Sequence, residues 1–141
     1  MDIWIQAASA GEAYLATSLA AALRPAIPLG IHLTSNTRQG VDIITGARAE
    51  LGVRYPALGV TCSYFPFDHP KIMQRAVSIL QPKVMVLLET EIWPGLLLAL
   101  KRQGTRILMV NARMTAKSLE RYCLRPTLWS ALAPDKLWAI S

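Results

Sequence analysis

The chain has 141 residues, of which 52% are hydrophobic and 17% are charged, and its formal net charge is +6. This composition supplies enough apolar side chains for one buried core and excludes a disordered chain. The positive charge favours anionic partners, but the Lys and Arg residues are scattered without forming a run, so we do not expect a nucleic-acid partner.

Cysteine usage and hydropathy narrow the class of protein further. Cys62 and Cys123 stand far apart with no CxxC or Cys/His spacing, so we expect neither a disulfide framework nor a metal site. We expect no secretory signal peptide at the start of the chain. The longest apolar runs are split by Glu89 and Glu91 and are far shorter than the roughly 20 residues that span a bilayer. The sequence therefore predicts a soluble chain from a reducing compartment.

The first half of the chain alternates strand-like and helix-like patterns. Residues 3–8 are predicted to form a strand, and Ser-Ala-Gly-Glu at residues 9–12 a turn into a helix. A strand at residues 30–35 follows, and Thr37 is the expected cap of a helix that runs to about Leu51. The apolar stripe predicted for the first helix consists of Leu15, Leu19 and Leu23 with Ala16 and Ala20 beside them.

The second half continues the same alternation. Residues 62–65 indicate a short strand, and Asp68, with Pro70 after it, is expected to open a helix. The predicted apolar face of that helix carries Ile72, Ala76, Ile79 and Leu80. Residues 84–88 form a continuous apolar run, which is typical of a central parallel strand buried on both faces. The remaining predicted elements are a helix from Trp93 to Gln103 with Gly104 as its stop, a strand at 107–110, a helix at 116–125 that Pro126 kinks or ends, and a strand at 137–140.

The order of the predicted elements defines the fold class. Alternating strands and helices predict an α/β protein with a Rossmann-like parallel sheet and helices on both faces. No internal repeat, low-complexity tract or linker divides residues 1–141, so we expect one domain. Because the last predicted strand has no helix after it, we expect this domain to be part of a longer protein.

Polar side chains follow four of the predicted strands. Ligands bind at the carboxyl ends of the strands in open parallel sheets, so these residues are the candidates for a site. In chain order they are Ser9, Gly11 and Glu12; Asn36, Thr37 and Arg38; Glu89, Thr90, Glu91 and Trp93; and Asn111 and Arg113.

Glu12 has two interpretations that are compatible with each other. The spacing Ser9-x-x-Glu12 is that of a capping box, in which Ser9 caps the helix and Glu12 reaches back to the backbone N–H of Ser9. A carboxylate at a helix start beside Gly11 can also act as a general base toward a substrate hydroxyl that approaches closely. With Gly11 as the only glycine of the turn, the loop lacks the GxGxxG pattern of a dinucleotide-binding protein.

The other candidates carry weaker signals. Glu89 and Glu91 fit a helix start, where carboxylates meet the helix dipole favourably, but two acids in one cleft also suit acid/base chemistry. Trp93 fits a core position as well as a substrate platform. Arg38 and Arg113 fit solvated surface positions as well as phosphate binding. His32 and His69 receive no catalytic role.

Three ordered blocks of sequence resemble one known family. IWIQAASAGE, LLETEIWPG and ILMVNARMT, in this order and at this spacing, are similar to the amino-terminal domain of bacterial 3-deoxy-D-manno-octulosonic acid (Kdo) transferases. The pattern extends from Trp4 to about Ser141. It departs from the usual family pattern at Gly95, where Asn is common, and at Gln6, where His is common.

The resemblance implies a fold, an activity and partners. The fold would be the amino-terminal, acceptor-side half of a B-type glycosyltransferase, with a carboxyl-terminal nucleotide-sugar domain outside residues 1–141. The enzyme would transfer Kdo from CMP-Kdo to a lipid A precursor at the cytoplasmic face of the inner membrane, with inversion and with neither metal nor cofactor. Glu12 would be the general base and Glu89 a second functional acid.

The same resemblance places the remaining candidates at the substrate cleft. The residues implied there are Ser9, Gly11, Arg38, Glu91, Trp93, Asn111 and Arg113. We expect the 141-residue chain to fold but not to catalyse transfer alone. Two alternatives are a nucleotide-binding Rossmann module of an oxidoreductase and a non-catalytic domain that docks on a partner or a membrane.

Overall fold

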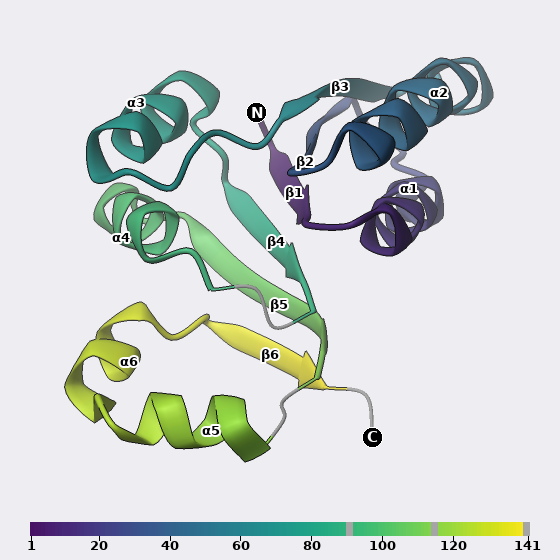
Figure 1. Cartoon of the computed structure of the whole chain (residues 1–141). Helices are drawn as coiled ribbons and strands as arrows, with labels where there is room; N and C mark the ends of the chain where they lie inside the picture. Colours follow the sequence, from purple (N-terminus) through teal and green to yellow (C-terminus); the bar gives the residue numbers. More distant parts are fainter. Residues whose placement is uncertain (90–91, 114–115, 140–141) are drawn as a thin grey trace.

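The sheet is parallel and six-stranded in the computed structural model, which describes residues 1–89, 92–113 and 116–139. The strand order is β3-β2-β1-β4-β5-β6, so the chain starts in the middle of the sheet and builds outward first to one edge and then to the other (Figure 1). The strands are β1 (Ile3–Ala7), β2 (Leu29–Ser35), β3 (Leu58–Tyr64), β4 (Val84–Leu88), β5 (Arg106–Ala112) and β6 (Lys136–Ala139). This topology confirms the predicted Rossmann-like α/β class.

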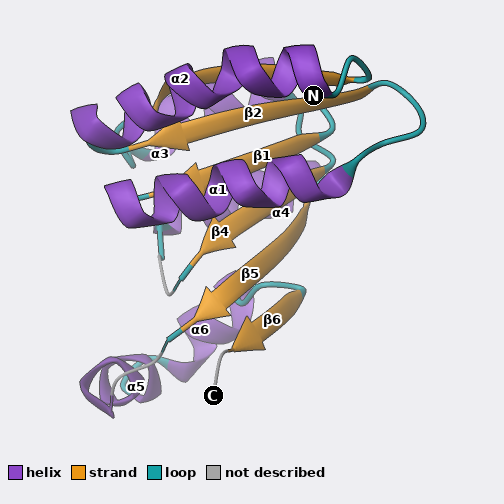
Figure 2. Cartoon of the chain, turned by 90° about the vertical axis from the view of Figure 1, so that its right-hand side faces the viewer, coloured by secondary structure: helices purple, strands orange, loops and turns teal. Residues whose placement is uncertain are grey.

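Helices cover both faces of the sheet, as predicted. The described helices are α1 (Ala10–Leu23), α2 (Arg38–Arg54), α3 (Pro70–Leu80), α4 (Pro94–Gln103), α5 (Ala116–Cys123) and α6 (Pro126–Leu132). Figure 2 shows α1 and α2 in front of β1 and β2, while α3, α4 and α6 lie behind the sheet. The central strands β1, β4 and β5 therefore divide their side chains between two helical layers.

Strand β4 shows how the sequence produces this division. Met85 and Leu87 pack into the core on the α3 and α4 side, and Val86 and Leu88 pack into the core on the α1 and α2 side. All four side chains are at most 5% exposed. Since successive side chains of a strand point to opposite faces, a strand buried on both faces must be apolar throughout, as residues 84–88 are.

Local chemistry fixes several helix ends where the sequence predicts them. The Thr37 hydroxyl accepts a hydrogen bond from the Gly40 N–H at 3.0 Å and so caps α2. Gly104 ends α4 with φ of 80°, a left-handed conformation that glycine adopts without a steric penalty. Other boundaries differ: β3 begins at Leu58, four residues before its predicted start, and a separate helix, α6, begins at Pro126, where the preceding helix was expected to kink or end.

The predicted apolar stripe of α1 is confirmed for Ala16 and Ala20 and wrong for Leu15 and Leu23. Its buried apolar residues are Ala13, Ala16 and Ala20, which are fully buried, whereas Leu15 is 43% exposed and Leu23 is 39% exposed. The small alanines let α1 pack closely on the sheet. Leu19 and Leu23 instead border an open apolar depression of about 290 Å³ beside β4 and β5.

The prediction for helix α3 is also wrong in two respects. Asp68 does not cap it, because His69 is the N-cap residue and its side chain makes no capping hydrogen bond. The buried residues of α3 are Met73 and Val77, while Ile72 and Ile79 are 44% and 70% exposed. Ala76 and Leu80 do pack against the core as predicted, so the apolar face of α3 is rotated from the predicted one rather than opposite to it.

Candidate functional site

The predicted site residues from four strands lie along one edge of the sheet. All strands are parallel, so their carboxyl ends meet at this edge, where the arrowheads point in Figure 2. Glu12 stands in the first turn of α1 after β1, and Arg38 is the first residue of α2 after β2. Glu89 directly follows β4, and Asn111 is the next-to-last residue of β5. We refer to this edge as the carboxyl rim.

Glu12 is buried at the rim by the chain turn that carries it. It is only 5% exposed, and both of its carboxylate oxygens accept hydrogen bonds: Oε2 from the Ala8 N–H at 2.8 Å and Oε1 from the Ser9 hydroxyl at 2.9 Å. Ser9 in turn accepts from the Glu12 N–H at 3.3 Å, which confirms Ser9 as the cap of α1. The reciprocal bond differs from the predicted capping box, because Glu12 reaches the N–H of Ala8 rather than that of Ser9.

Burial raises the pKa of the Glu12 carboxyl above that of an ordinary glutamate. Loss of hydration is the largest cause, and the nearby charge of Glu89 adds to it. The hydrogen bonds from Ala8 and Ser9 lower the pKa but do not cancel the effect of burial. The result is a carboxylate that binds a proton more readily than a solvated one, which is the property of a stronger general base.

Two neighbouring residues of the rim adopt left-handed backbone conformations. The φ angles of Glu89 and Asn111 are 57° and 59°. The Glu89 N–H donates to the Val110 carbonyl at 2.9 Å, so the turn after β4 is tied to the end of β5. For non-glycine residues this conformation is uncommon and mildly strained, and such residues concentrate at functional sites.

Trp93 and Asn111 contribute buried polar atoms for which the described residues offer no partner. Both the indole Nε1 of Trp93 and the Oδ1 of Asn111 are buried, and neither has a hydrogen bond to any residue that the structure describes. Buried polar atoms are nearly always paired, so an unpaired donor and an unpaired acceptor near the rim are unusual. The Trp93 ring packs against Phe65 with ring centroids 5.0 Å apart, which makes Trp93 part of the core as well.

The remaining predicted site residues differ in how the structure places them. Ser9, Gly11, Arg38 and Arg113 are exposed near the ends of β1, β2 and β5. Glu91 lies outside the described residues. The structure therefore brings Glu12 and Glu89 to one rim, with exposed cations on α2 and after β5.

A buried polar network under the rim was not predicted as part of the site. Gln6, which is fully buried, donates from Nε2 to the Asn36 Oδ1, and its Oε1 accepts from the Thr34 hydroxyl. The Trp4 indole N–H donates to Thr34 Oγ1 at 2.8 Å. A glutamine inside the apolar strand IWIQA was the available sequence signal. The network holds Asn36 beside the end of β1.

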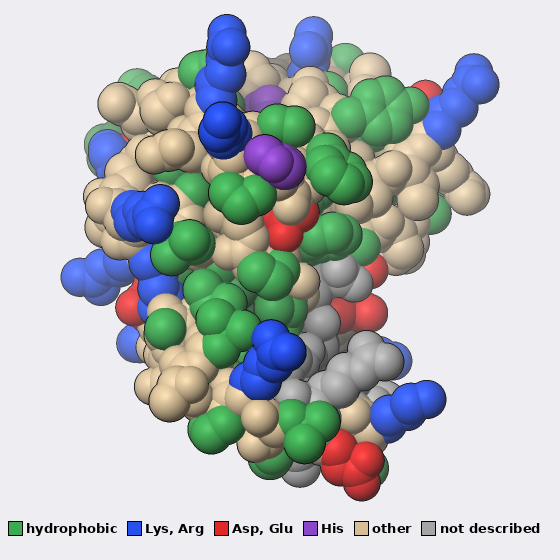
Figure 3. All heavy atoms as spheres, turned by 60° about the vertical axis from the view of Figure 1, so that its left-hand side comes forward, with side chains coloured by type: hydrophobic (Ala, Val, Ile, Leu, Met, Phe, Trp, Pro, Cys, Tyr) green, Lys and Arg blue, Asp and Glu red, His purple; other side chains and the backbone are tan. Residues whose placement is uncertain are grey.

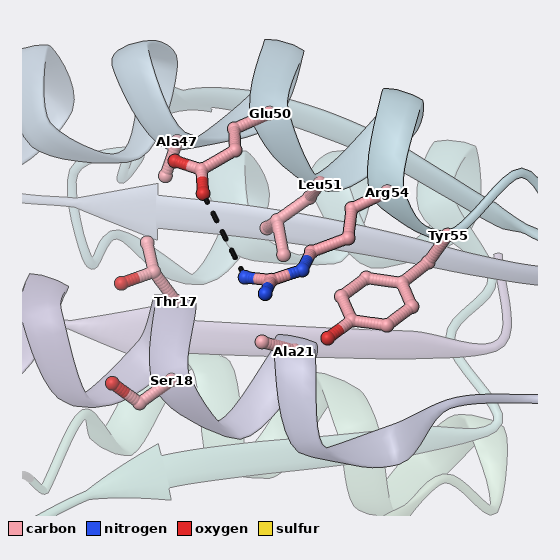
Figure 4. A pocket seen from close by; sticks show the side chains of 8 residues that line it. All are labelled: Thr17, Ser18, Ala21, Ala47, Glu50, Leu51, Arg54 and Tyr55. Atoms are coloured by element: carbon pink, nitrogen blue, oxygen red, sulfur yellow. Dashed lines mark ion pairs between the residues drawn. The ribbon is translucent and has the colours of Figure 1, made fainter.

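A depression between α1 and α2 lies away from the carboxyl rim. It measures about 190 Å³ and is bordered by the second half of α1 and the end of α2, as Figure 4 shows. Arg54 Nη1 and Glu50 Oε1 lie 3.9 Å apart there, and both side chains are largely exposed. The end of α2 leads into β3, so this depression faces the amino ends of the strands, away from Glu12. Its lining residues are Thr17, Ser18, Ala21, Ala47, Glu50, Leu51, Arg54 and Tyr55.

Metal-binding clusters and membrane-spanning helices are both absent from the part of the chain that the structure describes. In residues 1–89, 92–113 and 116–139, no three or more His, Cys, Asp and Glu side chains gather as they would around a metal ion. In the same ranges, no helix combines the length and apolarity needed to cross a membrane.

Comparison with known proteins identifies the family. The family model described as 3-deoxy-D-manno-octulosonic-acid transferase (kdotransferase) matches residues 1–139. The 3-deoxy-D-manno-octulosonic acid transferase of Haemophilus influenzae is 32% identical over 136 residues, which are 93% of this chain and 30% of that protein. The enzyme of the same name from Bordetella pertussis is 32% identical over 121 residues, 84% of this chain and 27% of that protein.

A third relative carries a second activity in its name. It is the bifunctional glycosyltransferase/methyltransferase of Fusobacterium nucleatum, 28% identical over 122 residues, which are 85% of this chain and 18% of that protein. The chain thus spans less than a third of each of these three relatives. Because the family model covers all but the last two residues, the chain belongs to the Kdo transferase family of glycosyltransferases and corresponds to its amino-terminal domain.

Proposed function

We propose that this chain is the acceptor-side domain of an enzyme that transfers Kdo from CMP-Kdo to a lipid A precursor in lipopolysaccharide biosynthesis. The observation that carries the proposal is the buried Glu12 carboxylate with its raised pKa, placed beside Glu89 at the carboxyl rim. A hydroxyl group is a poor nucleophile until a base removes its proton, and a desolvated carboxylate is suited to that task.

In the proposed reaction, Glu12 takes the proton of the acceptor hydroxyl as its oxygen attacks the anomeric carbon of Kdo. The bond from that carbon to the phosphate oxygen of CMP breaks, and its electron pair leaves with CMP. Attack on the face opposite the departing CMP inverts the configuration, in the way that inverting glycosidases place a base opposite their leaving group. The step as proposed uses neither metal nor cofactor.

The other rim residues support this step in the proposal. Glu89 is the second functional carboxylate of the site. Its negative charge helps to keep the pKa of Glu12 raised. The unpaired Nε1 of Trp93 and Oδ1 of Asn111 bind acceptor hydroxyls or oxygens. Ser9 and Gly11 shape the turn around Glu12, while Arg38, Arg113 and Glu91 contact acceptor groups.

The partners follow from the same proposal. CMP-Kdo is bound mainly by a carboxyl-terminal domain of the longer protein. The acceptor is a membrane lipid, so the enzyme works at the cytoplasmic face of the inner membrane. A surface suited to it lies on and before α3, where Phe67, Ile72 and Ile79 are exposed and so are Lys71 and Arg75. Figure 3 shows hydrophobic and basic side chains side by side on this side of the molecule. Apolar side chains mixed with cations favour the surface of an anionic membrane.

Replacing the proposed base tests the function. In the longer protein, we expect Glu12→Gln to lower the rate of Kdo transfer at least about a hundredfold, the lower end of the range for loss of a general base. The glutamine keeps one oxygen that can accept from Ala8 or Ser9, so far-UV circular dichroism and the urea midpoint should change little. Glu50→Gln, at an exposed carboxylate on α2, is the control. Full activity in Glu12→Gln would refute the assignment of the base.

A further inference from the structure

The start of helix α4 is held by a residue from a distant part of the chain. Trp93 is the N-cap residue of α4, but its side chain makes no capping bond, and Pro94 has no amide hydrogen. Asp68 takes the place of a cap: Oδ2 accepts from the Gly95 N–H at 3.1 Å and Oδ1 accepts from the Leu96 N–H at 2.8 Å. A carboxylate here satisfies two free amides and interacts favourably with the helix dipole.

Gly95 leaves the space that this carboxylate occupies. A Cβ atom at position 95 would lie 2.8 Å from Oδ1 and 3.3 Å from Cγ of Asp68, and the three atoms nearest to it all belong to Asp68. Any larger residue at position 95 must therefore displace the carboxylate from its two amides. Asp68 and Gly95 therefore form a matched pair.

The loop that carries Asp68 is itself anchored at the rim. It connects β3 to α3, and its first residue, Phe65, donates its N–H to the carbonyl of Ser35 at the end of β2. The Phe65 ring also contacts the rings of Trp4 and Trp93, with centroids 6.2 Å and 5.0 Å away. Residues 65–68 thus join the end of β2 to the start of α4, which packs beside α3 in Figure 1.

The described residues on either side of residues 90–91 are each held by another element. Glu89 is tied to β5 through its bond to the Val110 carbonyl. Only three residues separate Glu89 from Trp93, after which Asp68 holds the first amides of α4. The chain between Glu89 and Trp93 is therefore short, so the two positions are close along the sequence.

We propose that Asp68 is a positioning residue of the candidate site, which fixes the start of α4 and, through it, the rim segment that carries Glu89. Asp68 also occupies the amides at the α4 N-terminus, so that these donors do not serve an anionic ligand. The consequence for transfer rests on the proposed function of Glu89, whereas the structural link between Asp68 and Glu89 does not.

The structural link is tested in the 141-residue chain by NMR. In Asp68→Ala, we expect amide hydrogen exchange of Leu96 to accelerate about tenfold, as loss of a helix cap predicts, and the Glu89 amide and Trp93 indole signals to shift. Asp68→Asn keeps one accepting oxygen and should give an intermediate result. Asp135→Ala is the matched control, because Asp135 accepts from the Ile107 N–H at 2.7 Å at the amino end of β5. Equal changes at Leu96 and Glu89 in Asp68→Ala and Asp135→Ala would overturn the proposal.

The matched pair predicts a reversal of sign for a second substitution. Gly95→Ala should lower the urea midpoint of the wild-type chain, because the new methyl group displaces Asp68. In the Asp68→Ala background the same substitution should raise the midpoint, since alanine favours the helix and the obstructing carboxylate is gone. If Gly95→Ala changed the urea midpoint in the same direction in both backgrounds, the absence of a side chain at position 95 would not be what makes room for the Asp68 carboxylate.

Activity of the longer protein separates this inference from the proposed function. We expect Asp68→Ala to lower kcat for Kdo transfer about tenfold or more with little change in KM for CMP-Kdo, and Asp135→Ala to leave both unchanged. An unaltered kcat in Asp68→Ala would overturn the positioning role. If the unsubstituted protein transfers no Kdo, the proposed function fails, and the NMR comparison still decides whether Asp68 positions Glu89.

Discussion

At the scale of single residues, Glu12 combines a structural and a chemical role. Its carboxylate accepts from Ala8 and Ser9, and so completes the turn between β1 and α1. Each carboxylate oxygen has a second lone pair, so these two bonds leave room for a proton. Burial opposes the charge that the two hydrogen bonds favour, and burial has the larger effect. The same turn that Glu12 caps therefore also buries its carboxylate and raises its pKa.

The raised pKa of Glu12 predicts how stability depends on pH. A carboxyl group whose pKa is higher in the folded than in the unfolded chain stabilises the fold fully below the unfolded value. That contribution is lost as the pH rises through the raised folded pKa. We therefore expect the free energy of unfolding of the wild type, relative to that of Glu12→Gln, to fall as the pH rises from about 4 through this window.

Urea titrations of both proteins at several pH values measure this difference. Glu50→Gln controls for the loss of one negative charge, because the Glu50 side chain is 77% exposed. If the free energy of unfolding of the wild type instead rose with pH relative to that of Glu12→Gln, hydrogen bonding would outweigh burial, and the folded pKa of Glu12 would be lowered.

At the scale of helices and strands, the sequence predicted features that depend on near neighbours. Ser9, Thr37 and Gly104 end or begin helices through bonds and backbone angles within a few residues. Asp68 has the residue type of a cap, but the helix it caps begins 26 residues later, at a contact that only the folded chain creates. The sequence thus indicated that Asp68 caps a helix, but it did not indicate that this helix is α4.

The candidate site shows the same limit. Placing Glu12, Arg38, Glu89 and Asn111 after parallel strands was enough to predict that they share one edge, because strand direction decides it. The unpaired atoms of Trp93 and Asn111 depend on the packing around them, so no sequence pattern could reveal them.

Helix α1 gives a stability prediction at this scale. Ala16 is fully buried against the sheet, so Ala16→Leu should reduce the free energy of unfolding by about 1–3 kcal/mol through overpacking. Leu15 is 43% exposed, and Leu15→Ala should change the free energy by only about 0.5 kcal/mol. Urea unfolding of the two variants compares them directly. A larger loss in Leu15→Ala would restore the leucine stripe as the buried face of α1.

At the scale of the whole molecule, one sheet separates two hydrophobic cores. The core on the α3 and α4 side includes Trp4 and Leu87, and the core on the α1 and α2 side includes Leu33 and Val86. Trp4 and Leu87 alternate with Ile5 and Val86 along β1 and β4, so each of these strands contributes to both cores. Loss of packing on one face must therefore disturb the strands that support the other.

This shared sheet predicts cooperative unfolding. Leu87→Ala and Leu33→Ala each remove a fully buried side chain from a different core, and each should reduce the free energy of unfolding by about 2–5 kcal/mol. Both variants should still unfold in a single urea transition that coincides for tryptophan fluorescence and far-UV circular dichroism, because neither core persists without the strands of the other. If Leu33→Ala instead showed an early loss of helix while Trp4 stayed buried, the α1 and α2 layer would unfold separately. The carboxyl rim would then join a stable half, with Glu89 and Trp93, to a less stable half that carries Glu12.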